Sequence, residues 1–177
     1  MQDERDVRDG PFDAIASVGM FEHVGAARLA EYFRHLHALL GPSGRLLNHG
    51  ISRPPGERRS RFARRSFIDS FVFPDGELHE VGRVVSTMQD AGFEVRDVES
   101  LREHYALTLR NWVSNLEGQR EEALRIAGEG RYRVWRLYMA AAAMNFEAGR
   151  TQVHQILGVR ADGGTSGVPL RRADTVL

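Results

Sequence analysis

The chain has 177 residues, of which 42% are hydrophobic, and its 24 basic residues, all arginine, balance 24 acidic residues. These values are typical of one compact domain, and a net charge of 0 excludes a broad basic field that would attract nucleic acid. With no cysteine there is no disulfide framework and no cysteine-bound metal, so we predict a cytoplasmic protein without a metal site.

The first predicted elements follow a charged amino terminus that lacks the apolar stretch of a signal peptide. The apolar run FDAIASV at 12–18 is typical of a buried strand. Apolar residues at spacings of three and four predict a helix over 26–40, which ends at GPSG, and 45–51 is a second short strand. A strand, a helix and a strand form a βαβ unit, which favours a parallel sheet within an α/β fold.

The rest of the chain predicts further helices, two more strands and two irregular segments. In chain order, the regular elements are a helix over 77–91, a strand over 93–98, a helical region over about 104–126, a helix over about 131–148 after the break GEG, and a strand over 151–159. The sequence 53–65 contains two prolines and six arginines and predicts a loop or lid. The glycine-rich tail 161–177 predicts disorder, and no window offers the roughly 18 apolar residues of a membrane-spanning helix.

The apolar character of the strand at 12–18 favours a central place in the sheet. If the strand is central, one of its edges has no partner strand supplied by this chain. An unpaired apolar edge is a site for pairing with another chain. Both a second copy of this chain and a separate amino-terminal half are compatible with such pairing.

Polar side chains gather where the first two predicted strands end. Glu22 and His23 lie in SVGMFEHVG at 17–25, and His49 lies in LLNHGI at 46–51. The carboxyl ends of parallel strands are where open α/β sheets bind ligands, and an acid beside a histidine offers a base with a hydrogen-bond partner. On these residues alone, Glu22 as a helix cap with a solvated His23 is an open alternative. Similarly, Tyr105 in LREHYALTLRNW either joins this site or simply begins an amphipathic helix.

Five blocks in order carry a family resemblance that no single motif carries. They are VGMFEHVG, LLNHGI, FPDGEL, DAGFEVRDVESLREHYALTLRNW and RLYMAAAAMNFEAGRTQVHQILGVR. From about Asp3 to Arg160 the chain resembles the carboxyl-terminal part of the cyclopropane-fatty-acyl-phospholipid synthase family, which includes the mycolic acid cyclopropane synthases. Members of this family are methyltransferases that depend on S-adenosylmethionine.

The resemblance implies a class I methyltransferase fold, a Rossmann-like α/β sheet. This chain would supply the fourth strand onward, with a terminal antiparallel strand pair, over residues 1–160. The family's glycine-rich loop, which holds the cofactor, has no counterpart in residues 1–11. At roughly 30 residues for each strand-and-helix step, about a hundred residues of the family pattern are not matched. An inactive remnant or a binding module that pairs through an exposed sheet edge is therefore the alternative to an enzyme.

The activity implied by the resemblance is methyl transfer to the double bond of unsaturated fatty acyl chains of phospholipids. In this family a bound bicarbonate then removes a proton from the methylated chain. The matching blocks assign the bicarbonate ligands to Glu22, His49, the backbone of Ile51 and Tyr105, and Glu22, His49 and Tyr105 are the implied catalytic residues.

The matching blocks also imply cofactor contacts at Asp3, Glu4 and Val18. The sequence departs from the family pattern at Glu4, where an aromatic residue is usual, and at Asn48, where an apolar residue is usual. Ala142 stands where many members carry cysteine.

The arginine-rich segment Arg53–Arg65 falls in the lid region of the family pattern. Its six arginines and the nearby aromatic residues are suited to contact phospholipid headgroups at a membrane surface. A solvated loop is the alternative, and both remain open on the sequence. The expected partners are unsaturated phospholipids, with peripheral membrane contact and no nucleic acid.

Overall fold

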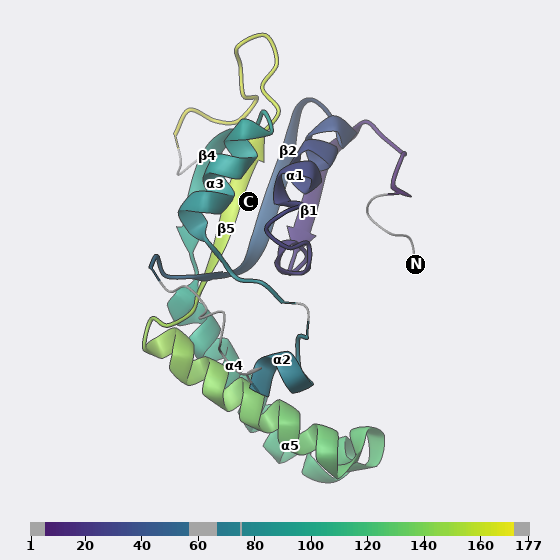
Figure 1. The fold of residues 1–177 in the computed structure, drawn as a ribbon, viewed down its shortest axis with the longest axis vertical. Coiled ribbons are helices and arrows are strands. Elements are labelled where there is room, and N and C mark those ends of the chain that lie inside the picture. The colour runs from purple at the N-terminus through teal and green to yellow at the C-terminus, as the bar shows by residue number, and fades with distance from the viewer. Residues whose placement is uncertain (1–5, 57–66, 75, 172–177) are drawn as a thin grey trace.

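The computed structural model describes residues 6–56, 67–74 and 76–171 of the chain (Figure 1). Its elements are β1 Phe12–Val18, a 3-10 helix Phe21–His23, α1 Leu29–Leu39, β2 Leu40–Arg53, α2 Phe67–Phe71, β3 His79–Glu80, α3 Val81–Asp90, β4 Glu94–Ser100, α4 Arg102–Gly118, α5 Arg120–Glu147 and β5 Gln152–Val159. None of the helices described is long and apolar enough to cross a membrane.

The strands form one mixed sheet in the order β1-β2-β5-β4, with β3 paired to β2. β1 runs parallel to β2 and is joined to it through α1, which confirms the predicted βαβ unit. β5 runs antiparallel to both β2 and β4, which confirms the predicted antiparallel pair at the end of the chain. The helix predicted from residue 77 begins only at Val81, because His79 and Glu80 are extended and pair with Ser52 and Arg53.

The apolar strand β1 lies at one edge of the sheet rather than at its centre. Beyond it, the described residues supply no further strand, so its outer edge is open as expected. Ser17 faces α1 and shares a hydrogen bond of 2.6 Å with the hydroxyl group of Tyr32. The alternate side chains face the other way and are exposed, Val18 at 62%. The prediction of a buried strand is therefore wrong for this face, because nothing in the described part of the chain covers it.

Helices α1 and α3 cover one face of the sheet (Figure 1). In α1 the buried side chains recur at spacings of three and four, the pattern that predicted this helix. They pack with side chains of β2, α3 and β5 into the main core, whose buried members are Phe21, Leu29, Tyr32, Phe33, Leu36, Leu40, Leu46, Val84, Met88, Phe93 and Ile156. This core fixes the orientation of β1 and β2, and with it the edge at which their carboxyl ends lie.

Helices α4 and α5 form an antiparallel pair that extends beyond the end of the sheet (Figure 1). The helical region predicted over 104–126 is interrupted at Gln119, whose backbone is not helical, so α4 ends one residue earlier. The predicted break at 128–130 is a kink within α5, where Gly128 has φ 75° and ψ 163°. Only glycine adopts such a conformation readily, so the kink is encoded at this position.

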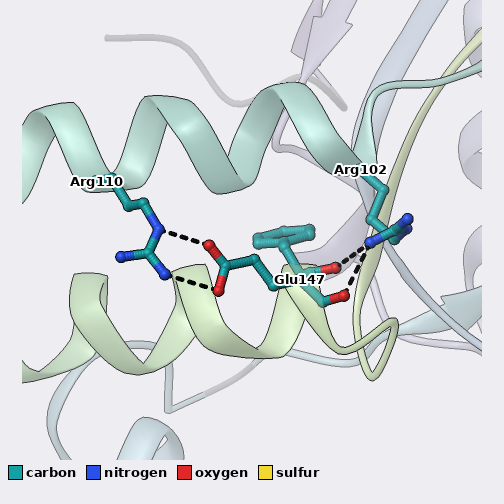
Figure 2. A network of polar contacts seen from close by, with 4 residues as sticks. Arg102, Arg110 and Glu147 are labelled. Atoms are coloured by element: carbon teal, nitrogen blue, oxygen red, sulfur yellow. Dashed lines mark hydrogen bonds and ion pairs between the residues drawn. The ribbon is translucent and has the colours of Figure 1, made fainter.

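A polar network joins the base of α4 to the end of α5 (Figure 2). Arg102 Nη1 donates hydrogen bonds of 2.6 and 3.2 Å to the carbonyl groups of Phe146 and Glu147. Arg110 forms a two-pronged ion pair with the Glu147 carboxylate, at 2.5 and 2.8 Å. These contacts hold the two helices in register where they meet the sheet.

The remaining segments carry little regular structure. Residues 161–171 contain one isolated bridge, between Asp162 and Thr165, and 172–177 lie outside the described residues, so disorder of the tail stays a prediction. The predicted lid over 53–65 also lies largely outside the described residues, which omit 57–66. The short helix α2 follows it and was not predicted.

We predict that Phe146→Ala destabilises the chain by about 3–4 kcal/mol, because it removes a large side chain from a packed core. Phe146 is 3% exposed and packs with Ala106, Leu109 and Val153, whereas nearby Met144 on the same helix is 61% exposed. Urea unfolding of the two alanine variants measures the difference. Equal losses for Phe146→Ala and Met144→Ala would contradict this packing.

Candidate functional site

The carboxyl ends of β1 and β2 lie side by side at one edge of the sheet. Val18 pairs with His49 in the parallel register, and the Gly19 amide donates a hydrogen bond of 2.9 Å to the His49 carbonyl group. After β1 the chain turns through the 3-10 helix Phe21–His23, which brings the Glu22 side chain to β2. Open α/β sheets bind ligands at this edge, so the predicted polar residues do reach a position suited to chemistry.

Glu22 is buried and holds the end of β2. Its Oε1 accepts a hydrogen bond of 2.7 Å from the Ile51 amide, while the buried Oε2 has no hydrogen-bond partner among the described residues. Burial raises the pKa of Glu22, against the lowering effect of the Ile51 amide. A raised pKa favours the protonated carboxyl group, which can donate a hydrogen bond while still accepting one.

His49 and Tyr105 form a second polar pair beside Glu22. His49 Nε2 and the Tyr105 hydroxyl group are 2.8 Å apart, and Tyr105 comes from the first turn of α4. Burial lowers the pKa of His49. Burial, and then the nearby charge of Glu22, raise the pKa of Tyr105. Neutral imidazole and phenol are thus favoured, and His49 Nδ1 is buried without a hydrogen-bond partner among the described residues.

Gly50 makes this arrangement possible because it has no side chain. A Cβ atom at this position would overlap the ring of Phe21 and lie 2.9 Å from Glu22 Oε1. Both groups therefore rest against the bare backbone of β2 between His49 and Ile51. Gly50 does not have a positive φ angle, so a glycine is needed here to let Phe21 and Glu22 approach the backbone closely.

A cavity of about 1090 Å³ opens beside Glu22 and Ile51. Its apolar wall includes Ile68, Phe73 and Tyr138, and it also contains polar groups from α3 and from the turn before β5. His49 and Tyr105 are not among the residues that line this cavity. Over the described residues, no cluster of three or more histidine, aspartate or glutamate side chains could hold a metal ion.

The structure gathers some of the predicted site residues and not others. Glu22, Ile51, His49 and Tyr105 come together as two hydrogen-bonded pairs. Exposed His23 points instead toward Phe73, with ring centroids 5.9 Å apart, so it is not part of the polar cluster. Of the three predicted cofactor contacts, Val18 lies exposed at the end of β1, and Asp3 and Glu4 lie outside the described residues.

Glu77 is a site residue to which the sequence assigned no role. Its amide donates a hydrogen bond of 2.8 Å to the Glu22 carbonyl group, and its Oε2 accepts one of 2.8 Å from the Ala26 amide. These two contacts clamp the turn that carries Glu22. In the sequence, only its place in the block FPDGEL could have indicated a role for Glu77. Its contact with Glu22 could not be predicted, because the two residues lie far apart along the chain.

Solved structures identify the class of protein that this fold and site define. The chain has a TM-score of 0.78 to the mycolic acid cyclopropane synthase CmaA1 complexed with SAH and CTAB, at 32% identity over 88% of this chain and 57% of that one. The cyclopropane synthase MmaA2 from Mycobacterium tuberculosis gives 0.76, at 32% identity over 84% of this chain and 55% of that one. The fold is thus similar to class I S-adenosylmethionine-dependent methyltransferases over part of their length.

Sequence comparison narrows the class to a family. The chain is 46% identical over 170 residues to the "Probable fatty acid methyltransferase" of Pseudomonas putida, and 41% identical to the "Probable fatty acid methyltransferase Rv3720" of Mycobacterium tuberculosis. The family model for mycolic acid cyclopropane synthetase matches residues 1–156. The chain therefore belongs to this family of S-adenosylmethionine-dependent methyltransferases. The two matches cover 91% and 96% of this chain. They cover only 42% and 39% of the length of the two relatives.

We predict that Gly50→Ala lowers the free energy of unfolding by about 2–3 kcal/mol, because the added methyl group displaces Phe21 and Glu22. Gly82 is the matched control, since it lies in α3 with open space around its Cα. Gly82→Ala should raise stability by about 0.5–1 kcal/mol, because alanine is the better helix residue. Thermal or urea unfolding of both variants measures the two effects, and a neutral Gly50→Ala would contradict the close packing.

A second prediction concerns the pH dependence of stability. Because burial raises the pKa of Glu22, the folded chain holds this proton more tightly than the unfolded chain does. The contribution of Glu22 to stability is therefore greatest below its ordinary pKa of 4.5 and falls as the pH rises through the raised value. In Glu22→Gln this loss is absent, and the amide oxygen still accepts from Ile51.

Urea unfolding of the parent chain and of Glu22→Gln from pH 4 to pH 8 measures this effect. The stability difference should shift in favour of the glutamine variant as the pH rises. Contributions from the buried histidines appear in both proteins and cancel in the difference. A difference that does not change with pH would show that the pKa of Glu22 is not raised by folding.

Proposed function

We propose that this chain supplies the substrate cavity and the proton-handling groups of a fatty-acid methyltransferase that acts on double bonds of unsaturated phospholipid acyl chains. The observation that carries the proposal is the position of the Glu22–Ile51 and His49–Tyr105 pairs at the carboxyl edge of the sheet, where Glu22 and Ile51 line a large cavity. Family membership and the names of the relatives support the substrate class.

The cavity is suited to an acyl chain. Its volume of about 1090 Å³ is at the upper end of the range for small-molecule sites, roughly 300–1,000 Å³. Ile68, Leu78 and Phe146 add apolar surface to its wall, and Glu22 adds a carboxyl group to the lining. An acyl chain would bury its methylene groups here with its double bond beside Glu22.

The polar pairs are suited to hold bicarbonate, the base that the family resemblance implies. Bicarbonate would supply a small base that needs no mobile side chain. Glu22 Oε2 and His49 Nδ1 are buried and have no hydrogen-bond partners among the described residues, which leaves both unsatisfied in the absence of a bound group. A neutral Glu22 carboxyl group would donate to an anion instead of repelling it, and Tyr105 would fix the ring of His49.

S-adenosylmethionine would supply the electrophilic methyl group. Of the three residues expected to hold it, the described part of the chain contains Val18, at the exposed end of β1. No GxGxG motif occurs in the chain. We therefore propose that residues 1–160 form the part of the domain from its fourth strand onward. A separate amino-terminal half would complete the cofactor site by pairing along β1.

The open edge of β1 also favours a second candidate, a binding module without catalytic activity. A strand edge with unpaired backbone groups and an exposed apolar face pairs readily with another strand. In this reading Glu22 and Tyr105 are structural residues, and pairing itself is the function.

Methyl transfer by the 177-residue chain mixed with the unmatched amino-terminal segment of the Pseudomonas putida relative tests the proposal. The substrate is phosphatidylglycerol with cis-monounsaturated chains, and the donor is S-adenosylmethionine with a labelled methyl group. We expect transfer by the mixture and none by the chain alone. Glu22→Ala should lower the rate at least about 100-fold, the usual contribution of a general base, because the bicarbonate that supplies the base would lose a ligand.

Glu31→Ala, which removes an exposed carboxylate on α1, is the matched control and should leave the rate unchanged. A mixture that forms a stable complex but transfers no methyl group would favour the binding module. Transfer by the chain alone would show that it binds the cofactor without a second polypeptide.

A further inference from the structure

Apolar side chains continue from inside the cavity to the outer surface around α2 and α5. Ile68, Phe73 and Tyr138 line the cavity. Outside it, Phe67 and Phe71 on α2 are 36% and 65% exposed, and Trp135 on α5 is 43% exposed. We call these three exposed residues the aromatic rim.

Ring contacts join the aromatic rim to the cavity wall. The ring centroids of Phe67 and Phe71 are 5.4 Å apart, and those of Trp135 and Tyr138 are 5.7 Å apart. Trp135 thus contacts the cavity wall directly, and Ile68, which lies between Phe67 and Phe71 on α2, is itself part of that wall. Phe73, just after the end of α2, packs edge-on against Tyr138 of α5 at 5.6 Å. The rim and the apolar wall are therefore one continuous surface.

The charges beside this surface are mostly positive. Three guanidinium groups, those of Arg53, Arg83 and Arg150, line the cavity. Arg53 is paired with Glu80 at 2.8 Å, so Arg83 and Arg150 supply the excess positive charge. The two carboxyl groups in the lining belong to Glu22, whose pKa is raised, and to Glu77, which is hydrogen-bonded to a backbone amide. The mouth thus combines exposed aromatic rings with cationic groups, the combination that favours an anionic lipid surface.

A second copy of the chain is a poorer occupant for the aromatic rim. Aromatic side chains bury about 150–250 Å² each when they are fully covered, and the rim residues are only 36%, 65% and 43% exposed. The three together therefore offer at most about 360 Å² on one copy, or about 720 Å² on two. Stable interfaces between proteins bury about 1,200–2,000 Å² in total. A bilayer needs no such complementary partner surface, because each inserted ring gains by leaving water.

We propose that the aromatic rim docks this chain on the surface of an anionic phospholipid bilayer. Phe67, Phe71 and Trp135 insert at the interface, and an acyl chain then enters the cavity along a continuous apolar path without crossing water. The inference rests on the proposed function for its substrate, but docking is measured without methyl transfer. A failure of docking is therefore distinguishable from a failure of catalysis.

Vesicle flotation of the 177-residue chain tests the docking. The vesicles contain phosphatidylglycerol with cis-monounsaturated chains. The double variant Phe67→Ser with Phe71→Ser should lower the partition coefficient at least about tenfold, since two large apolar side chains no longer insert. The matched control replaces Val98 and Leu170, which are 39% and 97% exposed and lie away from the cavity, by serine and should bind as the parent does.

A fluorescence measurement gives a second, independent readout. The chain has two tryptophans, so Trp112→Phe leaves Trp135 as the single reporter. Vesicles with brominated acyl chains should quench Trp135 and shift its emission to shorter wavelength. This measurement needs no change in the rim itself, so it holds even where a rim variant misfolds.

Docking is overturned if the parent does not bind the vesicles, if rim and control variants bind equally, or if brominated chains leave Trp135 unquenched. It is also overturned if sedimentation shows a dimer of the parent that the rim variant abolishes, because a second copy would then cover the rim. Vesicle binding without methyl transfer in the reconstituted mixture would preserve the docking surface and contradict the proposed function.

Discussion

The hydrogen bond from the Ile51 amide to Glu22 joins the ends of two parallel strands, and the arrangement of the site depends on it. Glu22 follows β1 and Ile51 lies on β2, so this bond ties the turn after one strand to the backbone of the next. It forms only because Gly50 leaves room for the carboxyl group. Glu77 supports the same turn from the other side by bonding to the Glu22 carbonyl group. The position of Glu22 in the cavity lining is thus fixed by backbone contacts.

The spacing of apolar residues along the sequence predicted the helices and strands that bury one regular face. The 3.6-residue spacing over 26–40 and the alternation over 93–98 gave α1 and β4, because each buries one face against a single core. Features set by long-range contacts were missed. β3 exists only because His79 and Glu80 meet β2, and nothing in the local pattern marked the interruption at Gln119. The same limit hid the role of Glu77.

The residues of the candidate site were predicted more completely than the burial of the strand beside them. Strand ends and the family blocks together indicated Glu22, His49, Ile51 and Tyr105, and the structure places them in two bonded pairs. The prediction that β1 is buried assumed a complete sheet. The apolar composition of a strand shows that it is suited to burial. It does not show that the residues that would cover the strand are present, and in the described part of the chain Val18 is exposed. Asn48, where the family pattern is apolar, is fully buried and its amide has no partner among the described residues.

The polar network at the base of the α4–α5 pair also ties the candidate site to the cavity wall. Arg102 and Arg110 on α4 both bind the end of α5 at Phe146 and Glu147. Tyr105, the hydrogen-bond partner of His49, lies on α4, and Tyr138 of the cavity wall lies on α5. The position of the His49 ring and the shape of the cavity wall therefore depend on the same helix pair.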